Sequence, residues 1–381
     1  MPKTIGNVNN LKAIPFFSTA RQHARLADAL AAATQRVLQS NNYILGAELL
    51  AFEQAWAQFC GVQYAIGVAN GTDAITIALL ACGIGSGDEV ITAANTSPFT
   101  ALAITTSGAT PVFVDIGAGS FSMDVTALAT ACTPRTKAIV PVHLYGQPAD
   151  ILGVMAFAQT HGLHVIEDAC QAHGARVNGQ RVGSFGSLGT FSFYPTKNLG
   201  ALGDAGAITT NDPTLAERAR QLRNGGRVDR DHHALRGINS RLDELQAAML
   251  SVKLPHLDQW NVRRRAIAQR YTQALGKRGW IAPPPPDAIG VESVHHLYVV
   301  RTPQRDALRQ HLLAAGIGSL VHYPIPLHQH GAFKSLGYEQ DAFPNATHAA
   351  QEIVSLPLYP ELTDDECNQV IHALLTFNNS H

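Results

Sequence analysis

Between residues 63 and 210 the chain alternates short apolar, β-branched runs with longer helical segments. Several runs are apolar at nearly every position, as strands buried on both faces of a sheet are. The segments between them, such as 72–82 and 149–161, are long enough to be crossover helices. The pattern predicts an α/β fold, a three-layer helix–sheet–helix domain with a mainly parallel sheet of about seven strands. The runs are QYAIGVA, EVITAA, PVFVDI, KAIVPVHL, HVIEDA, TFSFY and GAITT.

The last third of the chain follows a different pattern. Residues 239–275 read as a long helical stretch interrupted near Pro255, and APPPPDAIG follows at 282–290. Helices are then expected around 304–315 and from Thr363 onward, with few strands between them. We therefore expect a large domain at residues 1–250 and a smaller C-terminal α+β domain at 251–381.

The first sixty residues contain one strongly amphipathic segment, residues 48–60. Its large apolar side chains recur at helical spacing, and Gly61 follows as a stop signal. We predict a helix that packs either on the sheet or on a partner chain. The apolar face consists of Leu49, Phe52, Trp56 and Phe59.

Composition narrows the classes of function. Of 381 residues, 46% are hydrophobic and 15% are charged, and the net charge is −1 without a long run of one sign. This balance argues against a nucleic-acid or anionic-membrane partner. We find no signal-peptide pattern, no apolar run near the ~20 residues that span a bilayer, and no CxxC or HExxH spacing. We expect a cytoplasmic protein with reduced thiols and no metal.

Three positions after predicted strands carry candidate chemistry. Gly71 and Thr72 follow the first run and open a helix, with Thr72 as its expected N-cap. The free N–H groups and positive dipole end of such a helix suit a phosphate, although the pair could equally be only a turn and a cap. Asp168 ends an apolar strand, where an unpaired carboxylate would be costly, so it needs a cationic partner or several hydrogen bonds. A structural ion pair with a nearby arginine is the alternative to a functional role.

Lys197 is the one lysine of seven that follows a strand at the same sheet edge as Asp168. Burial favours the neutral amine, which forms a Schiff base with an aldehyde. Ser192, five residues earlier, offers a hydroxyl for a phosphate oxygen. A lysine for the aldehyde, a carboxylate for a ring nitrogen and a phosphate cradle together indicate pyridoxal 5′-phosphate.

The chain resembles the DegT/StrS-type sugar aminotransferases, which are aspartate-aminotransferase-like (fold type I) enzymes that use pyridoxal phosphate. The resemblance covers nearly the whole chain, in order. It rests on GAELLAFEQAWAQFCGVQYAIGVANGTDAI, GATPVFVDI, PVHLYGQPADI, VIEDACQAHGA, GSLGTFSFYPTKNLGALGDAGAITT, GINSRLDELQAAML, HLYVVR, VHYPIPLH and SLPLYP.

The resemblance implies a role for each matching position. Lys197 would be the Schiff-base lysine and proton shuttle, and Asp168 would contact the pyridine nitrogen. Gln171 would bond near the phenolic oxygen of the ring. Gly71, Thr72 and Ser192 would hold the phosphate, and Asn239 would reach the phosphate of the neighbouring subunit. The resemblance thus also implies a homodimer with shared active sites.

One position departs from the family pattern. Family members often carry a ring-stacking aromatic after ANT, whereas Ser97 stands there in this chain. Phe99 is the candidate for the stacking face, and the alternative is that it begins the core of a helix. Tyr323 and His328 in VHYPIPLH are candidate substrate contacts, with structural packing as the alternative.

The resemblance implies transfer of an amino group, by expectation from glutamate, to a nucleotide-linked keto-sugar. The variant FYPTKNLGALGDAG is closer to members that act on a 3-keto-6-deoxyhexose. A 4-keto-sugar aminotransferase and a non-catalytic regulatory member that binds the cofactor are the alternatives. Dehydratase relatives carry histidine at the lysine position, so Lys197 argues against that branch.

Overall fold

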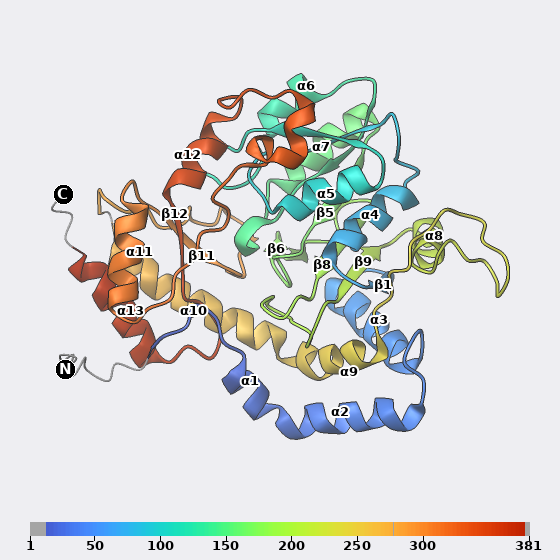
Figure 1. The fold of residues 1–381 in the computed structure, drawn as a ribbon, viewed down its shortest axis with the longest axis horizontal. Helices are drawn as coiled ribbons and strands as arrows, with labels where there is room; N and C mark the ends of the chain where they lie inside the picture. Colours follow the sequence, from blue (N-terminus) through green and yellow to red (C-terminus); the bar gives the residue numbers. More distant parts are fainter. Residues whose placement is uncertain (1–12, 277, 378–381) are drawn as a thin grey trace, which may run out of the picture.

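A seven-stranded sheet lies at the centre of the computed structural model, which describes residues 13–276 and 278–377 (Figure 1). The strand order is β1-β9-β8-β5-β4-β2-β3, and β9 is antiparallel to both neighbours, whereas the other pairs are parallel. All seven predicted runs are strands of this sheet, so the predicted fold class is confirmed. The strands are β1 (Tyr64–Val68), β2 (Glu89–Ala93), β3 (Thr110–Val114), β4 (Thr136–Val140), β5 (His164–Asp168), β8 (Leu188–Ser192) and β9 (Gly206–Thr210).

Helices cover both faces of the sheet. Successive residues of a strand point to opposite faces, so each strand contributes apolar side chains to two cores. Val90 and Val140 belong to a core beneath α4, α5 and α8, whereas Ile91 and Ile139 face α3, α6, α7 and α9. The helices in the described residues are α1 (Ala20–Arg25), α2 (Ala27–Ser40), α3 (Ala47–Cys60), α4 (Gly71–Ala81), α5 (Pro98–Thr106), α6 (Leu128–Ala131), α7 (Ile151–His161), α8 (Pro213–Arg223), α9 (Glu244–Lys253), α10 (Leu257–Leu275), α11 (Arg305–Ala314), α12 (Pro344–Glu352) and α13 (Asp364–Thr376).

A second core lies beside the sheet, on the left of Figure 1. The C-terminal half of α10, the antiparallel pair β11 (Tyr298–Arg301) and β12 (Ile353–Leu356), α11 and α13 build it. Ile14, from the beginning of the chain, also packs into it. Helix α13 begins as predicted, because Thr363 and Glu366 form a reciprocal capping box. A three-stranded sheet of β10 (Val291–Glu292), β6 (Arg176–Val177) and β7 (Gln180–Arg181) was not predicted.

Helix α3 is confirmed, with Gly61 at a φ of 75° as its C-cap. It packs on β1 and α9, so the alternative that it packs on the sheet is the one observed. The carboxylate of Glu244, the first residue of α9, accepts hydrogen bonds from Gly46, Glu48 and Leu49 N–H. The α3 N-terminus is thus closed by an anion from another helix, which its dipole favours.

Two local predictions are wrong. The N-cap of α4 is Asn70, whose Oδ1 accepts from Asp73 N–H at 2.8 Å, and Thr72 is already inside the helix. The helical stretch begins at Glu244 rather than at Asn239, because Asn239 and Asp243 form β-bridges with other segments. The interruption near Pro255 is present as a 3₁₀ turn between α9 and α10.

None of the helices within 13–276 and 278–377 is long and apolar enough to cross a bilayer. Over the same residues, no three His, Cys, Asp or Glu side chains gather in a way that could hold a metal ion.

Candidate active site

A cavity of about 800 Å³ opens at the carboxyl ends of the parallel strands. This is the edge where open α/β sheets bind ligands. Eight of the ten predicted site residues line it: Gly71, Thr72, Phe99, Asp168, Gln171, Ser192, Lys197 and Tyr323. Further lining comes from Asn70, Thr96, Ser97, Thr100, Val142, Cys170, Tyr194, Asp204, His296, Leu297 and His322, among others.

The phosphate end is built where α4 begins against the end of β8. The N–H groups of Gly71 and Thr72 precede the first intrahelical hydrogen bond and are available to a ligand. A Cβ at Gly71 would lie 2.7 Å from Ser192 Cβ and 2.8 Å from Cys170 Sγ, so only glycine fits. The backbone at Ser192 is held by His173, whose Nε2–H donates to Ser192 O at 2.8 Å.

Asp168, the last residue of β5, also lines the cavity and is 5% exposed. Thr100 Oγ1 donates to its Oδ2 at 2.8 Å, and Cys170 N–H donates to its Oδ1 at 3.2 Å. Asp168 forms no ion pair within residues 13–276 and 278–377. The suggested arginine partner is therefore not found, and the carboxylate is free to face a cationic ring nitrogen.

Lys197 lies in the loop between β8 and β9, where its N–H donates to Tyr194 O at 2.8 Å. Burial lowers the pKa of its amine, and the nearby Cys170 and Asp168 offset only part of this shift. A larger fraction of the amine is therefore neutral and nucleophilic at neutral pH. This is the form that reacts with an aldehyde.

The residue after the lysine anchors the loop. Asn198 Nδ2 donates to Asn261 Oδ1 at 2.9 Å and to Val294 O at 3.1 Å. Its Oδ1 faces His296 Nδ1 at 3.2 Å, which therefore donates. Burial holds the pKa of His296 well below its usual range, so the imidazole is neutral beside Lys197. At Asn198 the loop is therefore held by neutral groups rather than by an ion pair.

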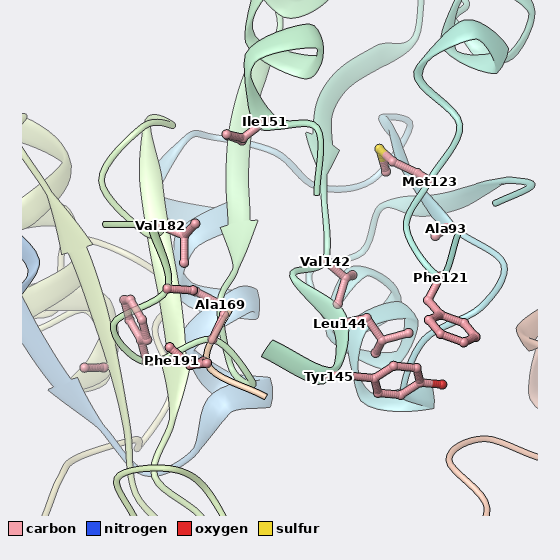
Figure 2. Close-up of a cluster of buried hydrophobic side chains, with 14 of the residues drawn as sticks. Ala93, Phe121, Met123, Val142, Leu144, Tyr145, Ile151, Ala169, Val182 and Phe191 are labelled. Carbon is pink, nitrogen blue, oxygen red and sulfur yellow. The ribbon is translucent and has the colours of Figure 1, made fainter. Parts of the chain in front are cut away.

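Gln171 and Tyr323 form one hydrogen-bonded unit at the cavity wall. Tyr145 N–H donates to Gln171 Oε1 at 2.8 Å, which turns the amide so that Nε2 donates to Tyr323 Oη at 3.1 Å. Tyr145, beyond β4 and beside Phe121 in Figure 2, also donates its hydroxyl to His322 O. Burial raises the pKa of Tyr323, so its hydroxyl stays protonated. The C-terminal part of the chain thus contributes to the cavity.

Three predicted residues lie at the edge of the cavity or outside its lining. Phe99 is 61% exposed at the cavity edge, so the alternative that it begins a helix core is wrong. His328 does not line the cavity: it is buried, its Nε2–H donates to Gln340 O at 3.0 Å, and it packs edge-on against Phe343. These contacts favour the packing alternative. Asn239 is exposed and also lies outside the cavity lining.

Sequence reasoning missed Thr100, His296 and His322. Thr100 lies within a predicted helix, and its only signal is its place one residue after Phe99. His296 and His322 come from loops more than ninety residues beyond Lys197, so no local spacing connects them to it.

Fold and site together define the class of protein. A three-layer α/β domain that places a half-buried lysine, a buried carboxylate and a glycine-opened helix around one cavity is the architecture of enzymes that attach pyridoxal 5′-phosphate to a lysine. The residues present fit this cofactor at its aldehyde, its ring nitrogen and its phosphate.

The chain belongs to the DegT/DnrJ/EryC1/StrS aminotransferase family, whose model matches residues 25–375. A relative in Streptomyces venezuelae, named dTDP-3-amino-3,4,6-trideoxy-alpha-D-glucose transaminase, is 45% identical over 361 residues, which are 95% of this chain and 95% of its own. A relative in Geobacillus stearothermophilus, named pleiotropic regulatory protein, is 45% identical over 365 residues, which are 96% of this chain and 98% of its own.

Solved structures agree with this family. The crystal structure of S. venezuelae DesV, in complex with a ketimine intermediate, has a TM-score of 0.93 and 45% identity, covering 95% of this chain and 97% of its own. Bacillus subtilis NtdA, crystallised with bound cofactor PMP, has a TM-score of 0.89 and 31% identity, covering 97% and 86%. The protein is therefore a pyridoxal-phosphate-dependent aminotransferase.

Proposed function

We propose that this enzyme moves an amino group from glutamate to a nucleotide-linked keto-sugar, at the 3-keto carbon of a 6-deoxyhexose. The observation that carries the proposal is Lys197, an amine of lowered pKa opposite Asp168 in a cavity of about 800 Å³. Site volumes of this size are at the upper end of the range for small-molecule pockets, which suits a cofactor together with a bulky substrate. The S. venezuelae relative is named as a transaminase of a 3-amino sugar.

The geometry supports the following binding roles, which are part of the proposal. Gly71 and Thr72 N–H and the Ser192 hydroxyl hold the phosphate at the start of α4, and Asp168 keeps a proton on the ring nitrogen. Gln171 presents only N–H groups to the cavity, because Tyr145 occupies its carbonyl, and so it binds the phenolic oxygen. Phe99, at the cavity edge, covers the ring face in place of the aromatic that Ser97 replaces.

Bound at these residues, pyridoxal phosphate supplies the aldehyde that reacts with amines and a ring that accepts electrons from the cleaved bond. Lys197 then acts as the general base and acid. Its neutral amine would take the proton from the donor α-carbon, and the ammonium so formed would give the proton back at the neighbouring carbon. A neutral amine is needed for the first of these steps, and burial provides it. Tyr323 contacts the sugar substrate from the cavity wall.

The test of the chemistry uses the cofactor's absorbance. Purified holoenzyme mixed with glutamate is expected to lose the absorbance of the bound aldehyde form, and a 3-keto nucleotide sugar is expected to restore it. A panel of dTDP- and UDP-linked 3-keto and 4-keto sugars decides the position of transfer. A spectrum that responds to no amino donor would favour the non-catalytic alternative, which the name of the G. stearothermophilus relative raises.

Lys197→Ala is the variant that tests the lysine. It is expected to bind the cofactor without a borohydride-reducible adduct, because no other amine takes its place. Lys137→Ala, at an exposed position on β4, is the matched control and is expected to retain the adduct. An adduct that persists in Lys197→Ala would exclude Lys197 as the attachment site.

We further propose a homodimer with shared active sites. Exposed apolar side chains gather on α2, α3, α9 and the segment that joins α2 to α3, which lie next to one another in Figure 1. Apolar surface of this kind is typical of an interface between subunits. The residues are Leu38, Tyr43, Ile44, Leu45, Leu50 and Leu245. Asn239, exposed and outside its own cavity, is then available to a phosphate in the partner's site.

Subunit mixing tests the shared site. Lys197→Ala and Asn239→Ala homodimers are each expected to have low activity. Mixed dimers contain one site with both residues intact, so activity is expected to rise on mixing. Sedimentation of the wild type as a monomer, or no gain on mixing, would contradict the shared site.

A further inference from the structure

Lys253 is a buried amine to which the proposed reaction assigns no role. It is the last residue of α9 and is 1% exposed. Its Nζ donates to Gly200 O at 2.8 Å and lies 3.1 Å from His23 Nε2. Burial and the charge of Lys253 lower the pKa of His23, so the imidazole is a neutral acceptor. Both partners of this cationic group are therefore uncharged.

An amine in this position is costly unless something requires it. Burying a cation without a hydrogen-bonded carboxylate is unfavourable, and an apolar side chain of similar size would avoid that cost. Burial accordingly lowers the pKa of Lys253 to about 8, although Glu361 raises it in part from a distance. The carbonyl of Gly200 accepts a hydrogen bond from the Lys253 amine, and from this position only a long side chain with a donor can reach it.

Gly200 belongs to the loop that carries Lys197, three residues further along. The loop folds back tightly, since a Cβ at Gly200 would collide with the carbonyl of Pro195. Fixing Gly200 therefore also fixes Pro195 and the turn in which Lys197 N–H donates to Tyr194 O. Because Gly200 packs directly against Pro195, a shift of Gly200 would also displace the turn that contains Lys197.

Two more side chains of the same helical unit hold this loop. Gln246 lies seven residues before Lys253, on the same face of α9, and its Oε1 accepts from Leu202 N–H at 2.8 Å. Asn261 on α10 accepts from Asn198 at 2.9 Å. Lys253 is the middle one of the three attachments along the loop, and it lies deepest.

We propose that Lys253 is a positioning residue for amino transfer: through the Gly200 carbonyl it holds the 195–202 loop so that the Lys197 amine reaches both carbons between which it moves the proton. The inference rests on the proposed role of Lys197 but not on which sugar accepts the amine. A misplacement of about 1 Å costs up to about 100-fold in rate, because the transferring groups leave their reactive geometry.

The test is Lys253→Met, which keeps the length and volume of the side chain and removes the donor. The single-turnover rate of the holoenzyme with glutamate is expected to fall about 10- to 100-fold while the half-saturating glutamate concentration changes little. Lys253→Arg retains N–H donors and is expected to restore part of the rate. A purely structural role would instead lower the unfolding temperature without this separation of rate from half-saturation.

Tyr271→Phe is the matched control. Tyr271 is also buried on this helical unit, and its hydroxyl donates to Pro357 O at 2.9 Å, away from the cavity lining. It loses one buried side-chain-to-carbonyl hydrogen bond, as Lys253→Met does, and is expected to keep the wild-type rate.

A wild-type rate in folded Lys253→Met would overturn the proposal. If that variant does not fold, Lys253→Leu, which also removes the donor, is read in the same way. If the wild type itself does not react with glutamate, the proposed donor is wrong. In that case the readout is the rate at which added pyridoxal phosphate attaches to Lys197 in the apoenzyme, in place of the single-turnover rate with glutamate. Equal attachment rates in wild type and variant would also overturn the role of Lys253.

Discussion

Replacing Gly71 by alanine tests how the phosphate is held. The new Cβ would lie 2.7 Å from Ser192 Cβ and 2.8 Å from Cys170 Sγ, whereas carbon atoms pack at about 3.5–4.0 Å. The start of α4 must therefore move away from the end of β8 by on the order of 1 Å. In the proposed site the phosphate would bond to groups of both elements, so after this movement it could not bond to both at ideal length.

The loss can be given a magnitude. A hydrogen bond to a charged group is worth about 1.5–3 kcal/mol, and it weakens steeply once the donor and acceptor separate beyond ~3.2 Å. Losing one such bond lowers the affinity for pyridoxal phosphate by about 10- to 100-fold. Pyridoxal without the phosphate makes no contact at Gly71, so its affinity is expected to change little.

The assay is titration of the apoenzyme with pyridoxal phosphate and with pyridoxal, followed by absorbance. Gly331→Ala is the control, because a Cβ there has no atom within 4 Å. Our account of the phosphate site would be refuted if Gly71→Ala bound pyridoxal phosphate as the wild type does. Equal losses for the two ligands would refute it as well, because the damage would then not be local to the phosphate.

Three further predictions concern buried polar groups. Thr100→Val removes a donor to Asp168 and is expected to destabilise the apoenzyme by about 1.5–3 kcal/mol in denaturant unfolding, with a smaller loss once the cofactor is bound; equal losses would contradict the pairing. Lys253 has its pKa lowered from 10.5 to about 8, so the unfolded chain binds more protons between these values. The free energy of unfolding of the wild type should therefore rise by up to about 3 kcal/mol relative to Lys253→Met as the pH rises through that window, and a constant difference would disprove the shift. Arg223→Met leaves the Glu53 carboxylate buried without its partner and should cost about 3–5 kcal/mol by thermal unfolding, whereas a cost below ~1 kcal/mol would show that Glu53 is solvated.

The sheet could be predicted because its strands are buried on both faces. β2 and β9 are buried at every position, and such continuous apolar runs are visible without any partner. Helix ends were harder to place. The cap of α4 is local, because Asn70 accepts from Asp73 N–H, but Asn70 and Thr72 are both residue types that cap helices. The start of α9 depends on a segment far away in sequence, because Asp243 pairs with Ile44. The boundary between domains near residue 250 stays a prediction.

The candidate site was predictable only where chemistry follows a strand directly. Asp168, Ser192 and Gly71 lie at strand ends, so topology alone brings them to one edge. Thr100 and His296 reach the cavity from a helix and a remote loop, and neither residue type is unusual in its place. Their roles appear only when the distances are known, as with Thr100 and Asp168 at 2.8 Å.

Strand β9, the one strand of the seven-stranded sheet that runs antiparallel to its neighbours, has a consequence for how the reactive lysine is placed. A parallel neighbour of β8 would require the chain to return to the opposite edge of the sheet, whereas an antiparallel one lets it turn round at the ligand edge. Residues 193–205 therefore form a loop that leaves and re-enters the sheet at the same edge. The strand residues on either side of it, Ser192 and Gly206, are paired with each other. The strand order alone therefore does not fix the course of this loop. Its course is fixed by contacts with α9 and α10 at Leu202, Gly200 and Asn198. The position of the reactive amine thus depends on how these helices pack rather than on how the strands pair.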